Sequence, residues 1–234
     1  MRIRIVSDLH VGSPVGLLGG RRSKKQAKQR NELQERLWEY WKDLWKVPYD
    51  ILVLNGDLMD LKYWDDVDEL QVALIDVLEE VPGIREKKLY IVEGTKNHER
   101  FFQGVVSEFK PVGGRTFEFL SLNVEGKTLN IAHHPELGGG TIYPGTVLSK
   151  TALFARVAYG RGKVVKVPDV IVRSHYHYFA AYQDSSITVV QTPAFCYQDD
   201  YAVKKGLFRF IPDIGAVDLV VSEDRVLVEP RLYE

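Results

Sequence analysis

The stretch Ile3-Arg4-Ile5-Val6-Ser7-Asp8-Leu9-His10 contains the pattern that decides the fold: a short apolar run followed at once by polar side chains. The pattern returns in Ile51-Leu52-Val53-Leu54-Asn55-Gly56-Asp57, and similar apolar runs occupy 89–92, 129–132 and 170–172. Runs this short and this rich in Ile, Val and Leu are typical of strands buried on both faces. The sequence therefore predicts five buried strands.

Amphipathic helices are expected between the first three of these strands. Leu33, Leu37, Trp41 and Leu44 repeat at helical spacing within residues 24–45, where further Trp and Tyr residues widen the apolar stripe. A second repeat runs through residues 67–81 until Pro82-Gly83 ends it. Strands that alternate with helices in this way indicate a mainly parallel, right-handed layer.

The later part of the chain has a different pattern. Residues 115–132 predict two strands joined by a turn at 125–127, with Phe117, Phe119, Leu122 and Val124 apolar along the first. A third helix is expected over about 146–159. Further strands are expected at 187–190, 207–211, 217–221 and 226–228. A parallel half followed by a meander predicts an α/β fold with two packed sheets and helices outside.

Composition limits the classes of protein that the chain can belong to. The 234 residues have a net charge of -1, which argues against a surface built as a whole to bind nucleic acid. The single Cys196 excludes an intrachain disulfide framework and a Cys-based structural zinc site. No apolar run is long enough to span a membrane, and the first residues resemble a strand rather than a signal peptide. We expect a cytoplasmic protein with one domain over 1–234 and a helical insertion at about 12–48.

All six histidines of the chain lie just after the five early strands. The carboxyl ends of the strands in an open α/β sheet form one edge, where ligands usually bind. These residues are therefore expected to meet at one point. The chemistry-bearing residues in the five places are Asp8 and His10, Asp57, Asn97 and His98, His133 and His134, and His175 and His177.

This group of side chains is suited to metal binding. Asp8 and His10 are two residues apart, as are His175 and His177, so in extended backbone each pair projects to one side. Carboxylate, imidazole and amide donors without thiolate favour Mn, Fe or Zn over Ca. Taken in order, Asp, His, Asp, Asn, His, His and His make seven candidate ligands, which are more than one tetrahedral ion needs and suit two ions that share a carboxylate. A strand-end Asp or His taken singly is more often a helix cap or turn residue, but that explanation requires every histidine to fall there by chance.

The order Asp-x-His, Gly-Asp, Asn-His, His and His-x-His, from Asp8 to His177, resembles the calcineurin-like metallophosphoesterase superfamily. The long insertion after Asp8-Leu9-His10 resembles its prokaryotic and phage-encoded branch. The resemblance implies a four-layer α/β/β/α sandwich with two mixed sheets and flanking helices. It also implies two divalent ions, with Mn expected and Fe, Zn or Ni as alternatives.

The resemblance implies a role for each residue of the set. Asp8, His10 and His177 would hold one ion, Asn97, His133 and His175 the other, and Asp57 would bridge them. His98 would act on the leaving group or stabilise the transition state. His134, Lys96 and Arg100 are expected to contact substrate.

Three positions depart from the pattern of the superfamily. Lys96 stands where Gly usually precedes the Asn-His pair, with Gly94 two residues earlier, and Ser174 replaces the Gly that usually begins the last motif. The fourth block offers both His133 and His134. Many members have His, any residue and then Pro, which favours His133 as the ligand.

The expected reaction is phosphate-ester hydrolysis. Two adjacent ions lower the pKa of a bridging water, so that hydroxide exists near neutral pH, and they neutralise charge on the phosphate. A histidine such as His98 can protonate the leaving alkoxide because its ordinary pKa lies near working pH. The first expectation is a phosphodiesterase or nuclease acting on nucleic acid or nucleotides. The alternatives are a phosphomonoesterase acting on phosphoprotein or nucleotides and, more remotely, a scaffold without catalysis.

Three segments have two interpretations each. The basic residues of 21–30 can contact a phosphate backbone or form the solvated start of the next helix. The Trp and Tyr stripe of 24–45 is expected to be core or a homo-oligomer contact rather than a base-stacking platform. Gly138 to Gly140 are expected to form a turn rather than a flap.

Overall fold

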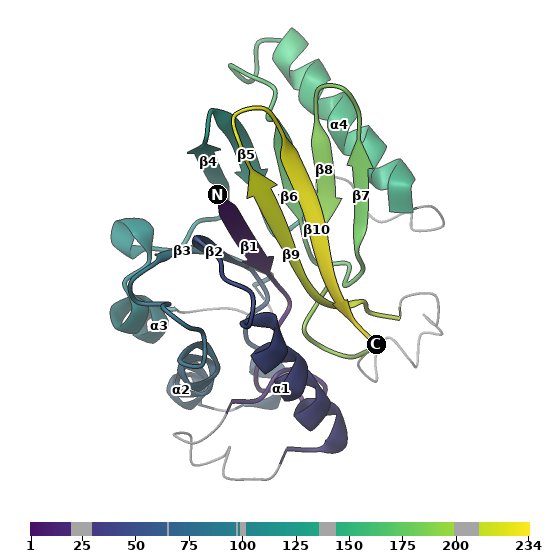
Figure 1. The fold of residues 1–234 in the computed structure, drawn as a ribbon. Coiled ribbons are helices and arrows are strands. Elements are labelled where there is room, and N and C mark those ends of the chain that lie inside the picture. The colour runs from purple at the N-terminus through teal and green to yellow at the C-terminus, as the bar shows by residue number, and fades with distance from the viewer. Residues whose placement is uncertain (20–29, 65, 97, 99–101, 136–143, 199–210) are drawn as a thin grey trace.

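The computed structural model describes residues 1–19, 30–64, 66–96, 98, 102–135, 144–198 and 211–234. Two mixed sheets face one another, and helices cover their outer faces (Figure 1). The arrangement is the α/β sandwich of layers that the sequence predicts. None of the described helices is both long enough and apolar enough to cross a membrane.

The first sheet has the strand order β10-β9-β1-β2-β3. Its centre is parallel, because β1 pairs with β2 and β2 with β3 in the same direction, whereas β9 and β10 are antiparallel. The bounds are β1 (Arg2–Val6), β2 (Ile51–Asn55), β3 (Lys88–Val92), β9 (Ile214–Val221) and β10 (Val226–Tyr233).

The second sheet has the strand order β4-β5-β6-β8-β7. Strands β5, β6 and β8 are parallel, and the outer strands β4 and β7 run antiparallel to their neighbours. The bounds are β4 (Leu120–Val124), β5 (Lys127–Ile131), β6 (Val170–Arg173), β7 (Ala180–Gln183) and β8 (Thr188–Gln191).

Three hydrophobic clusters hold the layers together. The middle cluster lies between the sheets and contains Ile3, Ile5 and Val53 of the first sheet and Ile131 and Val172 of the second. A larger cluster joins the other face of the first sheet to three helices: α1 (Glu32–Leu44), α2 (Val67–Leu78) and α3 (Gln103–Phe109). The third joins the second sheet to α4 (Pro144–Gly160). Two short 3-10 helices, η1 (Leu61–Tyr63) and η2 (Val112–Gly114), complete the described elements.

Helix α1 begins later than the apolar repeat predicts. The Asn31 side chain accepts a hydrogen bond from the backbone N–H of Gln34, and the Gln34 side chain accepts one from the backbone N–H of Asn31. This capping box starts the helix at Glu32. Leu33 is 41% exposed and does not join the buried stripe, whereas the Gln34 side chain is buried and donates to Ser13 O. Residues 20–29, which include most of the basic segment, lie outside the described residues.

The tryptophans of α1 and of its C-cap lie in the core. Trp38, Trp41 and Trp45 are at most 8% exposed, and Trp41 contacts Phe195 edge to face. Of the two expected roles, their burial fits the core one. An oligomer contact through this helix would use its exposed face, and it stays a prediction.

The expected strand at the start of 115–132 is partly wrong. Strand β4 begins only at Leu120, and its buried residues are Leu120, Leu122 and Val124. Phe119 has the opposite parity in the strand pattern and is 51% exposed. The short elements α3 and β7 have no clear sequence pattern and were not expected. The expected strand at 207–211 and the loop Gly138 to Gly140 lie outside the described residues, apart from Ile211, which is not in a strand.

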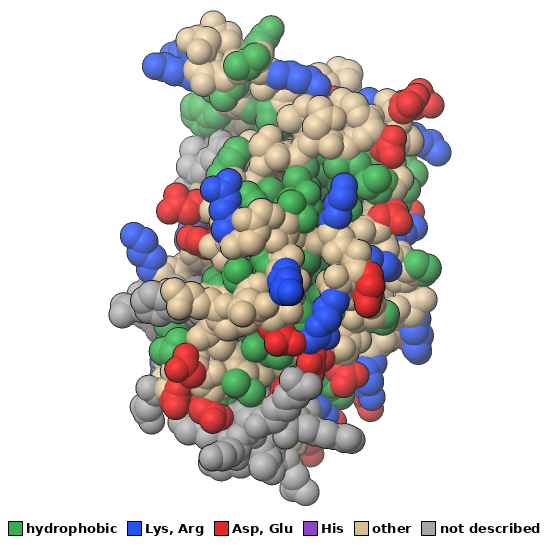
Figure 2. Space-filling model, turned by 90° about the vertical axis from the view of Figure 1, so that its left-hand side faces the viewer, with side chains coloured by type: hydrophobic (Ala, Val, Ile, Leu, Met, Phe, Trp, Pro, Cys, Tyr) green, Lys and Arg blue, Asp and Glu red, His purple; other side chains and the backbone are tan. Residues whose placement is uncertain are grey.

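The face with the edge strands β3 and β4 carries mixed charge. Figure 2 shows Lys and Arg side chains interspersed with Asp and Glu, and hydrophobic side chains exposed between them. This distribution agrees with the net charge of -1. The described part of this face is therefore not a single basic surface.

Candidate metal centre

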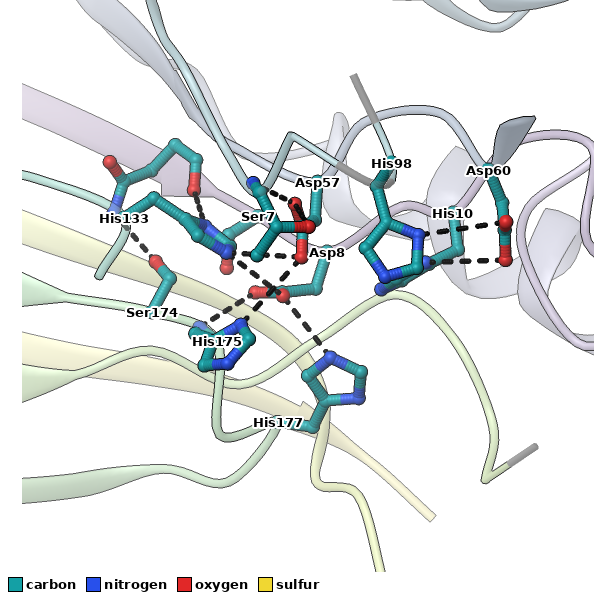
Figure 3. Close-up of polar contacts among 12 residues, drawn as sticks. Ser7, Asp8, His10, Asp57, Asp60, His98, His133, Ser174, His175 and His177 are labelled. Carbon is teal, nitrogen blue, oxygen red and sulfur yellow. Dashed lines mark hydrogen bonds and ion pairs between the residues drawn. The ribbon is translucent and has the colours of Figure 1, made fainter. Parts of the chain in front are cut away.

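Polar loops from both sheets meet where their parallel strands end, and the predicted residues converge there (Figure 3). Asp8 and His10 follow β1, Asp57 follows β2, His133 follows β5, and His175 and His177 follow β6. His98 lies beside them, whereas Asn97 and Arg100 lie outside the described residues.

The first ligand group consists of Asp8, His10 and Asp57. One donor atom from each lies within 4.8 Å of the others. His177 adjoins this group, because its Nε2 lies 3.1 Å from Asp8 Oδ1. All three residues of the group are buried, with Asp8 fully so.

The second ligand group consists of Asp57, His133 and His175, again with donor atoms within 4.8 Å of one another. Asp57 Oδ2 lies 3.1 Å from Nε2 of His133 and 3.7 Å from Nδ1 of His175. Asp57 is therefore common to both groups.

The backbone of these loops differs from the expected extended conformation. Asp8, His10, Asp57, His175 and His177 all have φ between 43° and 78°, in the left-handed region. The expectation that Asp8 and His10, or His175 and His177, project to one side as strand neighbours is wrong. Asp8 and His10 come together in a tight turn after β1 has ended, whereas His175 faces Asp57 and His177 faces Asp8. Non-glycine residues rarely adopt the left-handed backbone of these turns.

Backbone and side-chain contacts orient the candidate ligands. Asn55 O accepts a hydrogen bond of 2.8 Å from Nδ1 of His133, which leaves Nε2 of His133 directed at the carboxylates. Thr95 donates from its backbone N–H and its hydroxyl to Asp57 Oδ1, at 2.6 and 2.9 Å. This contact leaves Asp57 Oδ2 facing the two histidines.

A buried polar network supports the loops from below. The hydroxyl groups of Ser7 and Ser174 both contact Thr192 Oγ1, at 2.8 and 2.7 Å. The Asn55 side chain donates to Ser174 Oγ at 2.6 Å. Ser7, Asn55 and Ser174 each immediately precede a ligand-bearing turn, so the network joins the ends of three strands. Ser174 therefore uses its hydroxyl at the position where the superfamily usually has Gly.

Two glycines leave space for the ligands. A Cβ on Gly94 would lie 2.2 Å from the backbone N and 2.3 Å from Oδ1 of Asp57. A Cβ on Gly56 would lie 2.4 Å from Nδ1 of His133. Gly94, the glycine displaced by two residues from the family pattern, thus serves to admit Asp57.

Asp60 lies to one side of two neighbouring histidines, His10 and His98 (Figure 3). Its carboxylate oxygens face Nδ1 of His10 at 3.8 Å and Nδ1 of His98 at 3.5 Å. The rings of His10 and His98 meet edge to face, with centroids 4.6 Å apart. Asp60 therefore faces both imidazoles.

Several donor atoms of the cluster have no hydrogen-bond partner among the described residues. These buried atoms are Asp8 Oδ1, His10 Nε2, His133 Nε2 and His175 Nδ1. Buried polar atoms normally have partners, and leaving them without one is costly. Carboxylate oxygens and imidazole nitrogens that face one another in this way fit a divalent metal ion.

The electrostatics of the cluster follow from burial and proximity. Burial raises the pKa of Asp57, but its contacts with His133 and His175 outweigh this and hold it far below the usual range. Burial lowers the pKa of His133, but the charges of Asp8 and Asp57 raise it to about 9. The hydrogen bond to Asp60 raises the pKa of His98. The Asp57 carboxylate is therefore ionised, and a metal ion must displace a proton from His133 to bind there.

Residues at the edge of the cluster include those expected to contact substrate. His134 is exposed, and its ring centroid lies 5.3 Å from that of His175. Lys96 is also exposed. Thr95, Asn55, Thr192 and Cys196 were not predicted as site residues, because their roles depend on contacts between distant loops. The position of Asn55 just before Gly56-Asp57 is the one local signal that could have identified it.

Comparison with known proteins agrees with this geometry. The sequence profile of the calcineurin-like phosphoesterases matches residues 1–179. No curated protein sequence matches significantly. Among solved structures, an archaeal phosphodiesterase is similar at a TM-score of 0.54 and 12% identity, over 99% of this chain and 100% of that chain.

Two Vps29 structures show the same fold. The Entamoeba histolytica protein complexed with zinc has a TM-score of 0.51 and 11% identity, over 99% of each chain. The Chaetomium thermophilum protein has a TM-score of 0.50 and 13% identity, over 100% of this chain and 96% of that one. The chain belongs to the calcineurin-like phosphoesterase family, whose members use divalent metal ions. It is a hydrolase of phosphate esters.

Proposed function

We propose that this calcineurin-like phosphoesterase uses two divalent ions, with Mn the first choice and Fe, Zn or Ni as alternatives, to hydrolyse phosphodiesters of nucleic acids or nucleotides. The observation that carries the proposal is the shared position of Asp57, whose carboxylate belongs to both ligand groups. When bound, the ions would supply a nucleophile at neutral pH and neutralise charge on the phosphate.

The proposed ligands divide between the two groups as follows. Asp8, His10 and His177 hold one ion, and His133 and His175 hold the other, with Asn97 as an additional ligand. Asp57 contributes to both. His133 is preferred over His134 because its Nδ1 is bound to Asn55 O and its Nε2 faces Asp57, whereas His134 is exposed.

We assign proton transfer to His98. It is only partly exposed, lies beside His10, and has Asp60 at 3.5 Å from Nδ1. Asp60 favours the protonated imidazole, and Nε2 then carries the proton that the leaving alkoxide needs. His134 and Lys96, with Arg100, are proposed to contact the phosphate ester at the exposed edge.

Aromatic side chains beside the second group favour a nucleotide substrate. Tyr176 lies next to His175, with ring centroids 5.8 Å apart. Its ring is parallel to that of Tyr178, at 6.0 Å between centroids and 2° between planes. Aromatic faces bind bases by stacking without requiring a particular sequence. These rings could therefore hold a nucleobase next to its phosphate.

The direct test compares bis(4-nitrophenyl) phosphate with 4-nitrophenyl phosphate, using protein freed of metal and reloaded with Mn²⁺. Faster turnover of the diester is expected, with Asp57→Asn strongly impaired in metal content and activity. A preference for the monoester would replace the proposal with a phosphomonoesterase. Wild-type protein that binds no ion and hydrolyses neither ester would support the scaffold alternative instead.

A panel of natural substrates then identifies the class. Single-stranded DNA, duplex DNA, RNA, cyclic nucleotides and a phosphopeptide are compared with Mn²⁺ present. We expect cleavage of at least one nucleic acid or nucleotide. His98→Ala should be impaired, and so should His98→Gln, which keeps a side chain of similar size but cannot protonate a leaving group. Full activity of His98→Ala on the best substrate would remove His98 from proton transfer.

A further inference from the structure

Cys196 is the single cysteine of the chain, and it lies against the metal centre. It is 2% exposed, and its Sγ lies 3.5 Å from Nδ1 of His177 in a hydrogen-bonding arrangement. Neither the family pattern nor the proposed mechanism gives this sulfur a role. Its contact is with a residue that the mechanism does use.

The backbone on either side of Cys196 is bound to the loops of the site. Phe195 N donates to the carbonyl oxygen of Asp8 at 3.1 Å, and Tyr197 N donates to that of Val15 at 2.8 Å. His177 is held as well, because its carbonyl accepts a hydrogen bond of 2.8 Å from Asp213 N. The distance from the sulfur to the imidazole is therefore set by several independent hydrogen bonds.

The two ring nitrogens of His177 face different partners. Nε2 lies 3.1 Å from Asp8 Oδ1, on the side of the first ligand group, and Nδ1 faces the sulfur. A histidine that binds a metal through one nitrogen usually donates the other N–H to an acceptor, and this contact fixes its tautomer and orientation. The acceptor is commonly a carboxylate, a carbonyl or water.

His10 provides a second and independent sign that an ion binds on this side. Donor atoms of His10, His177 and Cys196 lie within 4.8 Å of one another. His10 is 8% exposed, and its buried Nε2 has no hydrogen-bond partner among the described residues. A buried imidazole nitrogen without a partner, next to His177 and Asp8, is suited to coordination.

We propose that Cys196 is a positioning residue of the metal centre: its sulfur accepts the Nδ1–H of His177 and so directs Nε2 toward the ion held by Asp8 and His10. The inference rests on the proposed dinuclear site. The sulfur contacts the imidazole of His177 and does not bind the ion itself. Sulfur is a weak hydrogen-bond acceptor, but this contact is buried, where water does not compete for the Nδ1–H of His177.

Two substitutions separate the acceptor role from packing. Cys196→Ser keeps an acceptor in a smaller side chain, whereas Cys196→Val fills the space without one. We expect Cys196→Val to lower the affinity for one of the two Mn²⁺ ions, the one held by Asp8, His10 and His177, by about 10- to 100-fold. This is the usual effect of losing a hydrogen-bond partner of a metal-binding histidine. Cys196→Ser should retain more affinity than Cys196→Val. The other ion, at Asp57, His133 and His175, should bind with nearly unchanged affinity in both variants.

The measurement is a calorimetric titration of metal-free protein with Mn²⁺. Equal affinity of wild type and Cys196→Val, or equal loss in both variants, would overturn the proposal. Thermal unfolding in EDTA checks that each variant is folded. Wild type that binds no Mn²⁺ would contradict the proposed function itself, so the two failures are distinguishable.

Wild-type protein gives a further test that needs no variant. In the zinc-loaded protein, ¹⁵N NMR of the histidine rings should show the proton of His177 on Nδ1. In the cobalt-loaded protein, the near-ultraviolet spectrum should lack sulfur-to-cobalt charge transfer. A proton on Nε2 of His177, or a strong charge-transfer band, would show that the sulfur does not act as proposed.

Discussion

At the scale of single residues, the candidate ligands have an unusual backbone. Among the described residues, seven non-glycine residues have positive φ, and five of them are Asp8, His10, Asp57, His175 and His177. Each such conformation costs on the order of 1–2 kcal/mol relative to ordinary backbone. The backbone strain and the buried atoms without hydrogen-bond partners both lower the free energy of unfolding of the metal-free protein. Bound ions are expected to offset this loss.

Metal removal should therefore lower stability. At an Mn²⁺ concentration about 100 times the dissociation constant, one ion stabilises the folded state by about 2.7 kcal/mol. For a chain of this size that corresponds to a rise in Tm of about 5–10 °C over the EDTA-treated protein. Differential scanning calorimetry with Mn²⁺ and with EDTA measures it. Asp57→Asn is the control and should show a much smaller rise, whereas an unchanged Tm in wild type would argue against a metal site.

Asp60 allows a prediction of pH dependence. Its contact raises the pKa of His98, and a general acid works only below its pKa. In Asp60→Asn the pKa of His98 should fall. The decrease of kcat on the alkaline side of the pH profile should therefore begin at a lower pH than in wild type. The maximal rate should also drop by about 10- to 100-fold, because Asp60 faces His10 as well. The pH profile of kcat for an aryl diester tests this, and an alkaline limb that does not move would contradict it.

At the scale of elements, apolar runs predicted the strands well, because a strand that is buried on both faces consists of consecutive apolar residues. The runs at 3–6, 51–54 and 170–172 correspond to β1, β2 and β6 within a residue or two. From the ends of those strands alone, the meeting of Asp8, Asp57 and His175 could be predicted. For Asp8 and Asp57 this succeeds because β1 and β2 are parallel neighbours in one sheet and place their carboxyl ends at one edge. His175 follows β6 of the second sheet and meets them because the two sheets pack with these ends together.

What the sequence could not provide depends on contacts between distant segments. Asp8 and His177 have left-handed backbone although neither is a glycine, the residue from which such a turn is normally predicted. Thr95 contacts Asp57, and Cys196 contacts His177. The spacing of these residues in the sequence does not predict either contact. The start of α1 could have been predicted more closely, because Asn31 and Gln34 form a capping box that can be recognised in the sequence.

That cap gives a prediction about α1. Asn31→Ala removes the acceptor for Gln34 N and the donor to Pro14 O, which joins the helix to the loop after His10. The free energy of unfolding should fall by about 1 kcal/mol, the usual cost of losing an Asn cap. Leu33→Ala is the control at an exposed position and should change it little. Urea unfolding measures both, and a larger loss for Leu33→Ala would mean that α1 packs differently.

At the scale of the whole molecule, the end of the chain completes the layer that the start begins. Strand β9 pairs with β1, so that Arg4 lies opposite Asp218. Arg4 donates from Nε and Nη2 to the two oxygens of Asp218, at 2.8 and 2.9 Å, and both residues are fully buried. Arg4 also donates to Leu44 O, at the end of α1, and to Val47 O, just after it. One buried ion pair therefore joins the first strand, the first helix and the C-terminal hairpin.

Loss of that pair should destabilise the whole fold. Asp218→Asn leaves the buried Arg4 without its counter-charge, and breaking a buried pair in this way costs about 3–5 kcal/mol. Glu229→Gln is the control, because its pair with Arg2 is partly exposed and should be worth less than about 1 kcal/mol.

Burial raises the pKa of Asp218, but the hydrogen bonds from Arg4 and Arg231 hold it below its ordinary value of 3.8. Its contribution is therefore complete above that value and is lost as the pH falls through the lower pKa of the folded state. Urea unfolding at pH 7 and at successively lower pH should show the gap between wild type and Asp218→Asn narrowing only in acid. A gap that is already small at pH 7 would mean that the hairpin is held by its apolar contacts alone.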